Sequence, residues 1–184
     1  MADLAKVLAF TFAQEGGYQN DSADNGNWTG GRVGVGRQIG TNHGISAATL
    51  AHWHAGPVGP ADMMGLTLAD ATAIAAALFA NPLRVHDLPA GVDLMVFEQG
   101  WGAGVRQGAL ALQAALGVAQ DGFIGPQTLT AAHQVDPDQL IEDIDLAARA
   151  RLQTLSSFQV FGRGWIARAD RRLAAAIAMA ASAP

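Results

Sequence analysis

The sequence predicts a mainly helical (α+β) protein, a two-lobed globule with one small β-hairpin. Apolar residues recur at helical spacing through most of the 184-residue chain. Glycine and other turn-forming residues are concentrated in one stretch, residues 16–44, which interrupts that pattern. Hydrophobic residues make up 50% of the chain and charged residues only 15%, so a sizeable core can be buried.

The first helix is expected over residues 2–15, where apolar residues recur at i, i+4 and i+8 from Leu4. Glu15 ends its apolar face, and either Gly16 or Gly17 is expected to supply a left-handed cap. Partial burial and the negative end of the helix dipole both disfavour the charged carboxylate. Glu15 is therefore either a general acid that keeps its proton or an ordinary surface glutamate of a last helical turn.

The next segment is dense in turn-forming residues. Residues 18–31 include two carboxylates, Asp21 and Asp24. Residues 32–40 then alternate apolar residues with polar residues or glycine, which predicts a short twisted hairpin. Ser46 is a suitable N-cap for the helix that follows.

The remaining chain is predicted to be helical by its periodicity. The expected helices cover residues 46–54, 67–80, 89–99, 105–116, 126–133, 137–157 and 164–181. Pro126 suits the first position of its helix, because the N–H that proline lacks is not needed there. A boundary near residues 83–89 divides the chain into regions 1–88 and 89–184.

Composition and charge exclude several classes of function. A net charge of −5 argues against nucleic acid as a partner, and the absence of cysteine excludes disulfides and a thiol nucleophile. The first residues lack the pattern of a signal peptide, and no apolar stretch is long enough to span a bilayer. We therefore expect a protein without membrane insertion that is cytoplasmic when synthesised. We also expect a monomer. Six arginines between Arg149 and Arg172 form either a binding patch or a solvated helix face.

Several short motifs then occur in a fixed order. They are Glu15-Gly16-Gly17-Tyr18, Asn20-Asp21, Ala23-Asp24, Gly40-Thr41, Gly44-Ile45-Ser46, Asp87-Leu88-Pro89-Ala90-Gly91, Asp121-Gly122-Phe123-Ile124-Gly125-Pro126 and Phe161-Gly162-Arg163-Gly164-Trp165. With these motifs the chain resembles glycoside hydrolase family 108, the phage-type N-acetylmuramidases (endolysins) of the lysozyme superfamily. Its second half resembles the predicted peptidoglycan-binding region that accompanies this family.

The resemblance implies a lysozyme-like fold with the hairpin beside the active-site cleft. It also implies hydrolysis of the β-1,4 bond between N-acetylmuramic acid and N-acetylglucosamine, with Glu15 as the acid. Asp24 would orient a water or stabilise the oxocarbenium-like transition state, with Asp21 as the second candidate, unless these are Asx-turn residues. Thr41 would hold the nucleophilic water, or it is a plain strand residue. The separation of the carboxylates, which a sequence does not give, decides between inversion and retention.

Four further residues are candidate sugar contacts through aromatic stacking or hydrogen bonding: Tyr18, Asn20, Trp28 and His43. We expect neither a cofactor nor a metal. The chain departs from the family pattern at Glu98, where the family has aspartate, and at Gly102, where it has asparagine. Glu98 is either a paired core carboxylate or a cleft residue.

The expected partner is peptidoglycan, which lies outside the cytoplasm. A holin or a dedicated export step would therefore release the protein to the periplasm or cell wall, for lysis or for release. Two alternatives remain open. One is a non-catalytic peptidoglycan-binding or secretion-assisting protein with a lysozyme-like fold, and the other is a chitinase-like hydrolase.

Overall fold

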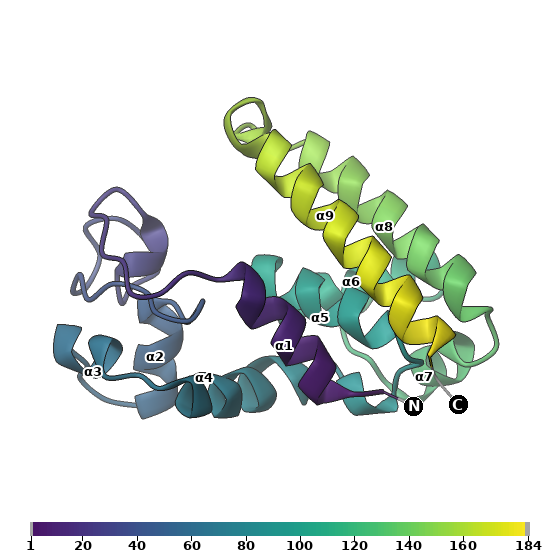
Figure 1. Cartoon of the computed structure of the whole chain (residues 1–184), viewed down its shortest axis with the longest axis horizontal. Helices are drawn as coiled ribbons and strands as arrows, with labels where there is room; N and C mark the ends of the chain where they lie inside the picture. The colour runs from purple at the N-terminus through teal and green to yellow at the C-terminus, as the bar shows by residue number, and fades with distance from the viewer. Residues whose placement is uncertain (1, 183–184) are drawn as a thin grey trace. The chain divides into compact units, whose positions relative to one another are not determined.

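The computed structural model describes residues 2–182, and this part of the chain is mainly helical (Figure 1). Its α-helices are α1 (Leu4–Gln14), α2 (Ala47–His54), α3 (Pro60–Met64), α4 (Leu68–Ala75), α5 (Val92–Ala103), α6 (Val105–Ala115), α7 (Pro126–Ala132), α8 (Pro137–Gln153) and α9 (Phe158–Ala181). Short turns of other helix types are η1 (Asn25–Asn27), η2 (Ala76–Ala80) and η3 (Val85–Asp87). No helix within residues 2–182 has the length and apolar character needed to cross a bilayer.

Every helix that the periodicity predicts is present, with ends shifted by a few residues. The predicted caps are also confirmed, because Ser46 Oγ accepts a hydrogen bond from Thr49 N at 3.2 Å, and Pro126 opens α7. The sequence reading missed α3, a five-residue helix that starts at Pro60 after Gly59. A helix of this length is shorter than the window in which periodicity is visible.

Two local predictions differ from the structure. Neither Gly16 nor Gly17 has a left-handed φ, so the predicted cap is wrong; α1 simply ends at Gln14. The hairpin expected over residues 32–40 is not confirmed. Extended segments in the described part pair only through isolated antiparallel bridges, which join Gln19 with Thr41, Trp28 with Gln38, and Asn42 with Ile45. Glycines on both sides of Val35 keep the chain in turns instead of a regular ladder.

The chain divides into two compact units. Unit 1 comprises Met1–Phe10 and Ala76–Pro184, and unit 2 comprises Thr11–Ala75. Unit 2 is thus a continuous segment that interrupts unit 1 in the sequence, and one boundary falls inside α1.

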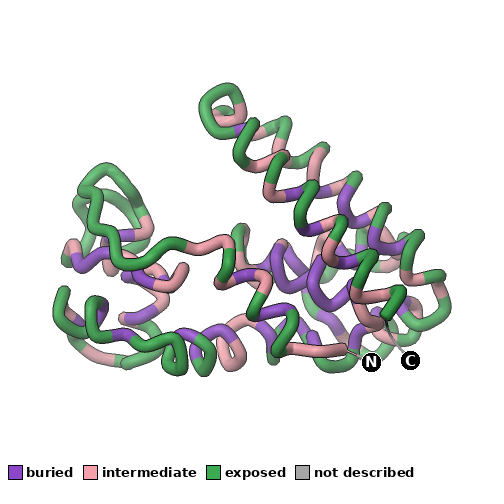
Figure 2. Tube along the Cα trace, in the orientation of Figure 1, coloured by how far each residue is buried: buried purple, intermediate pink, exposed green. Residues whose placement is uncertain are grey.

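Unit 1 is built around α5, which is buried on all sides along most of its length (Figure 2). Helices α6, α8 and α9 pack against it. A helix that is apolar on every face is typical of a central position in a core. The contact with α6 is close because two glycines meet there: a Cβ built on Gly108 would lie 2.9 Å from Gly100 N.

A buried carboxylate ties the first residues of the chain to α5. Asp93 is fully buried and accepts hydrogen bonds from the backbone N–H groups of Leu94 at 2.7 Å, Gly91 at 2.8 Å and Asp3 at 3.2 Å. Loss of solvent raises the pKa of Asp93, although these hydrogen bonds oppose the effect. The Asp3–Asp93 bond is one of the contacts that place residues 2–10 in unit 1.

Unit 2 combines helices α2–α4 with a long irregular loop, residues 19–45, which we call the bridge loop. The buried side chains of unit 2 include Ile39, Ile45 and Met63. Asn42 is also buried, and its Nδ2 donates to the carbonyl of Met63 at 3.0 Å, so the end of the bridge loop is fastened to the end of α3. This arrangement fixes the backbone on which the candidate site residues lie.

Candidate active site

Glu15 is the first residue after α1, and it is half-buried. Its backbone N–H donates to the carbonyl of Phe12 at 3.2 Å, which continues the last turn of the helix by one residue. Glu15 is four residues before Gln19, so the two Cα atoms are separated by at most about 14 Å. The end of α1 therefore places Glu15 in unit 2, four residues before the start of the bridge loop.

Gln19 joins two of the predicted catalytic residues. Its Nε2 donates to Asp24 Oδ2 at 3.0 Å and to Thr41 Oγ1 at 2.8 Å. Backbone hydrogen bonds in both directions, at 3.0 and 2.8 Å, also pair Gln19 with Thr41. The structure thus brings Asp24 and Thr41 together through one amide, although they are far apart in the bridge loop.

The sequence reading did not single out Gln19, although it named both of its neighbours, Tyr18 and Asn20. A glutamine in a turn-rich segment carries no signal of its own. Its role depends on two partners whose positions are set by folding, and only the three-dimensional structure reveals it.

Both candidate aspartates take part in local turns. Asp24 caps η1, with Oδ1 accepting from Gly26 N at 2.9 Å, and Asp21 Oδ1 accepts from Ala23 N at the same distance. The Asx-turn interpretation therefore holds for the geometry of both residues. Asp24 differs from Asp21 because its second oxygen faces the Gln19 amide and, through it, Thr41.

The buried side-chain amide of Asn27 holds the other end of the Gln19 amide. Asn27 is fully buried, and its Nδ2 donates to Gln19 Oε1 at 2.9 Å and to the carbonyl of Asp21 at 2.8 Å. Its backbone carbonyl accepts from Ile39 N at 2.9 Å. Asn27 thereby fixes the orientation of the Gln19 amide, because Oε1 is used as an acceptor and Nε2 must point to Asp24 and Thr41.

The four candidate sugar contacts lie around this network. Tyr18 is 38% exposed, and its ring covers Gly40, where an added Cβ would lie 2.6 Å from Tyr18 Cε2. Trp28 is half-buried, and its Nε1 donates to the carbonyl of Ser22 at 3.1 Å. The exposed Asn20 accepts, through its carbonyl, a hydrogen bond from Gln38 Nε2 at 3.1 Å.

His43 occupies the tight turn that closes the bridge loop. His43 and Gly44 have φ of 50° and 74°, and they lie between Asn42 and Ile45, which form an antiparallel bridge. Two successive residues with positive φ are typical of a type I′ turn. This geometry holds the half-buried His43 two residues beyond Thr41.

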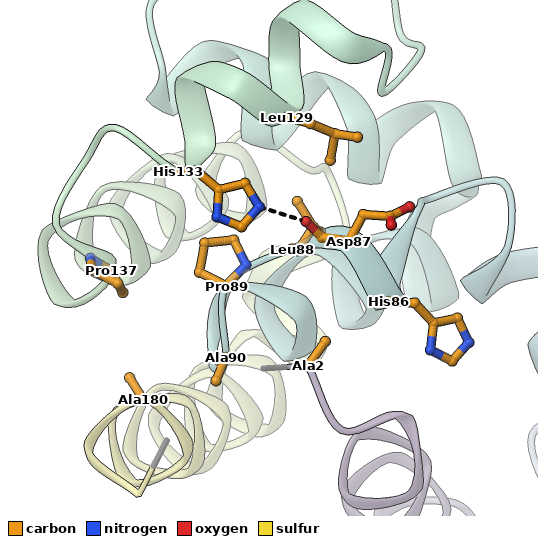
Figure 3. Close-up of a pocket in the computed structure, with 10 residues that line it drawn as sticks. All are labelled: Ala2, His86, Asp87, Leu88, Pro89, Ala90, Leu129, His133, Pro137 and Ala180. Carbon is orange, nitrogen blue, oxygen red and sulfur yellow. Dashed lines mark hydrogen bonds between the residues drawn. The ribbon is translucent and has the colours of Figure 1, made fainter. Parts of the chain in front are cut away.

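None of these residues lines the cavity of about 570 Å³ drawn in Figure 3. That cavity belongs to unit 1 and is lined by His86, Pro89 and His133, among others; His133 Nε2 is hydrogen-bonded to the carbonyl oxygen of Asp87 at 2.8 Å. Within residues 2–182, no group of three or more metal-ligating side chains is close enough to hold a metal ion.

Two family models and a solved structure match most of the chain. The family described as Glycosyl hydrolase 108 matches residues 8–104, and the family described as Predicted Peptidoglycan domain matches residues 107–170. Among solved structures, the SagA protein of Brucella abortus is similar, with a TM-score of 0.84 and 34% sequence identity over 96% of this chain and 95% of that chain. The search of curated proteins gave no match. The resemblance drawn from the motifs is thereby confirmed.

Proposed function

The chain belongs to the glycosyl hydrolase 108 family, and on that premise we propose that it is an N-acetylmuramidase. It would cleave the β-1,4 bond between N-acetylmuramic acid and N-acetylglucosamine in peptidoglycan. The observation that carries the proposal is the position of Glu15, half-buried at the end of α1 and four residues before the Gln19 amide that joins Asp24 and Thr41.

The proposed chemistry assigns one role to each of three groups. Glu15 protonates the glycosidic oxygen as the bond to the leaving sugar breaks. Thr41 Oγ1 accepts from Gln19, so its own proton is directed elsewhere and can donate to a water or a sugar hydroxyl. Asp24 carries negative charge next to this hydroxyl, where it can orient the attacking water or stabilise the positive charge that develops on the sugar ring.

The candidate sugar contacts surround these groups in the same unit. Tyr18 and Trp28 offer aromatic faces, and Asn20 and His43 offer polar side chains. Since all four are attached to the bridge loop or directly precede it, we propose that this loop forms the substrate-binding wall.

We also propose that the two regions of the chain have different functions. Residues 1–88 form the catalytic region, which contains every residue of the candidate site. Residues 89–184 form the wall-binding region, and the peptidoglycan-domain match over residues 107–170 supports this assignment. Because peptidoglycan lies outside the cytoplasm, a protein made there would act after release by a holin or an export system.

The test replaces the proposed acid by its amide. Glu15→Gln keeps the shape of the side chain and removes the proton, so release of reducing ends from purified peptidoglycan should fall about 10²–10⁴-fold. Mass spectrometry should identify reducing N-acetylmuramic acid ends with the unchanged protein. Glu142→Gln, an exposed glutamate in α8, is the matched control and should keep full activity.

Circular dichroism must show that each variant is folded. Near-normal release by Glu15→Gln would exclude Glu15 as the acid. If neither the unchanged protein nor the variant releases ends, but both pellet with the wall, the protein is a peptidoglycan-binding protein with the fold of a muramidase. Activity on chitin oligomers but not on peptidoglycan would instead indicate the chitinase-like alternative.

A further inference from the structure

Unit 1 contains a second cavity, of about 300 Å³, which the proposed reaction does not use. It is lined by residues of α5, α8, α9 and the turn between α8 and α9, namely Glu98, Gln99, Gly102, Ala103, Arg151, Leu152, Leu155, Trp165, Arg168 and Arg172. Three of the six arginines that cluster between Arg149 and Arg172 therefore face one small volume. The interpretation of that cluster as a simple solvated helix face does not describe Arg168 and Arg172, which form ion pairs and are largely buried, whereas Arg151 is exposed.

A buried ion pair forms one wall of this cavity. The Glu98 side chain is 1% exposed, and its oxygens accept from Arg168 Nε at 3.0 Å and from Arg168 Nη2 at 3.2 Å. This two-point contact makes Glu98 a paired carboxylate in a core helix, and Glu98 also lines this cavity, so both descriptions open from sequence apply to it. Its charge is balanced by Arg168, so it does not repel an anion strongly.

A second ion-pair network lies behind Arg172. Arg172 Nη2 donates to Asp145 Oδ1 at 3.0 Å, while Arg149 contacts both Asp145 and, at 2.9 Å, Asp170. These four residues carry two positive and two negative charges. Arg172 Nε is nevertheless buried without a hydrogen-bond partner among the described residues.

The cavity wall therefore has more donors than acceptors. Three guanidinium groups face it against the one carboxylate of Glu98. Arg151 is exposed, and it forms no ion pair within the described part of the chain, so its guanidinium is available to a ligand. A guanidinium offers donors in a planar fork that matches a carboxylate.

The other side of the cavity is apolar. Leu152, Leu155 and the half-buried Trp165 line it, and Gly102 leaves it open, since a Cβ at that position would meet nothing within 4 Å. A ligand that fits both sides carries a carboxylate next to small apolar groups. Short peptides with a free carboxylate have this character, whereas neutral sugars do not.

We propose that this cavity binds a carboxylate of the peptidoglycan stem peptide, with Arg151 as the main ionic contact and Trp165 as the apolar surface. The identity of the ligand rests on the proposed function, which makes peptidoglycan the substrate. Such a site would make the protein prefer glycan strands that carry peptides over strands from which the peptides have been removed.

The experiment measures binding of a free stem tripeptide to the full-length protein by isothermal titration calorimetry. Arg151→Gln should weaken this binding about 10-fold or more, as expected for loss of one charge-assisted hydrogen bond. Arg163→Gln is the matched control, since Arg163 is an exposed arginine of α9 that does not line this cavity and the change in net charge is the same. The affinity of Arg163→Gln for the tripeptide should stay within about 2-fold of that of the unchanged protein, because exposed charges at a distance are screened.

Two further ligands test the chemistry. The tripeptide with its carboxylates converted to amides should not bind measurably. N-acetylmuramic acid, whose lactyl carboxylate is free on strands that have lost their peptides, should bind more weakly than the peptide. Stronger binding of N-acetylmuramic acid would move the site to the glycan and overturn the peptide assignment.

The remaining outcomes are equally clear. No binding of the tripeptide, or equal weakening by Arg151→Gln and Arg163→Gln, would overturn the proposal. Glu15→Gln should bind the tripeptide like the unchanged protein, because binding does not require hydrolysis. A failure of this site with intact hydrolysis would therefore remove only the peptide site, and a failure of hydrolysis would leave this measurement unaffected.

Discussion

At the scale of single residues, a glutamine, Gln19, links the groups of the candidate site. Gln19 uses both ends of its amide: Nε2 contacts Asp24 and Thr41, while Oε1 accepts from Asp21 N at 3.1 Å and from Asn27 Nδ2. It is a positioning residue, which holds a carboxylate and a hydroxyl at fixed places. Its removal should loosen both of these groups at once.

Gln19→Met keeps the length of the side chain and removes its four hydrogen bonds. At about 0.5 kcal/mol for each bond, the low end of the usual range because the site is exposed, unit 2 should lose about 2 kcal/mol. The turnover number should fall more than the KM changes, since positioning of the catalytic groups is lost and the sugar contacts remain. Hydrogen exchange of residues 19–45 and steady-state kinetics measure these two effects.

The control for this variant is Gln134→Met, an exposed glutamine just after α7. It should change neither exchange in residues 19–45 nor the turnover number. Unaltered kinetics together with unaltered exchange in Gln19→Met would mean that Asp24 and Thr41 are held by the backbone alone.

The residues that could be predicted from the sequence are those with a local signal. The position of Glu15 at the end of an apolar helix is confirmed, and so are the cap Ser46 and the helix start at Pro126, whereas the catalytic role of Glu15 stays a prediction. Gln19 and Asn27 have no such signal, because each acts through partners elsewhere in the bridge loop. The local signal at Gly16 and Gly17 was misleading, since glycine permits a left-handed cap but does not impose one.

At the scale of elements, helices of seven or more residues were predictable, because their hydrophobic period and their capping residues are visible over that length. The bridge loop was not, because its bridges join residues up to 22 positions apart in the sequence, as Gln19 and Thr41 are. Its regular features are single bridges and turns, which have no period. The tight turn at His43 and Gly44 also lacks a strong sequence pattern, because type I′ turns favour Asn-Gly, Asp-Gly or Gly-Gly.

The close contact between α5 and α6 allows a test of how tightly these two helices pack. Gly108→Ala would place a Cβ 2.9 Å from both Gly100 N and Val96 O, so α6 must move away from α5. We expect a loss of about 1–3 kcal/mol in the free energy of unfolding, measured by chemical denaturation. Alanine has a higher helix propensity than glycine, and this difference offsets only part of the loss.

Gly164→Ala is the matched change, because Gly164 lies inside α9 and an added Cβ there meets nothing within 4 Å. This variant should be more stable than the unchanged protein by up to about 1 kcal/mol. If Gly108→Ala and Gly164→Ala shift the midpoint of chemical denaturation equally and in the same direction, steric contact between α5 and α6 does not control stability.

At the scale of the whole molecule, the first ten residues belong to unit 1 although α1 continues into unit 2. Leu8 is 5% exposed and lies in this first segment. Leu8→Ala should cost about 2–5 kcal/mol, the usual range for truncation of a buried leucine. Hydrogen exchange should accelerate in α5 and its neighbours more than in the bridge loop.

Leu68→Ala serves as its control, because Leu68 is 53% exposed at the start of α4. A surface change of this kind should alter stability by no more than about 0.5 kcal/mol. Faster exchange confined to residues 19–45 in Leu8→Ala would contradict the assignment of the first segment to unit 1.

The hydrogen bond from Asp3 to Asp93 has a consequence for the order of events on the ribosome. Its two partners are 90 positions apart, and at about 5–20 residues per second the acceptor is synthesised roughly 5–18 s after the donor. All of unit 2 is translated within that interval, since it ends at Ala75. Unit 2 can therefore complete its contacts during translation, while the first ten residues wait for the partners that finish unit 1. Residues 2–10 can thus be among the last of the described residues to form their native contacts.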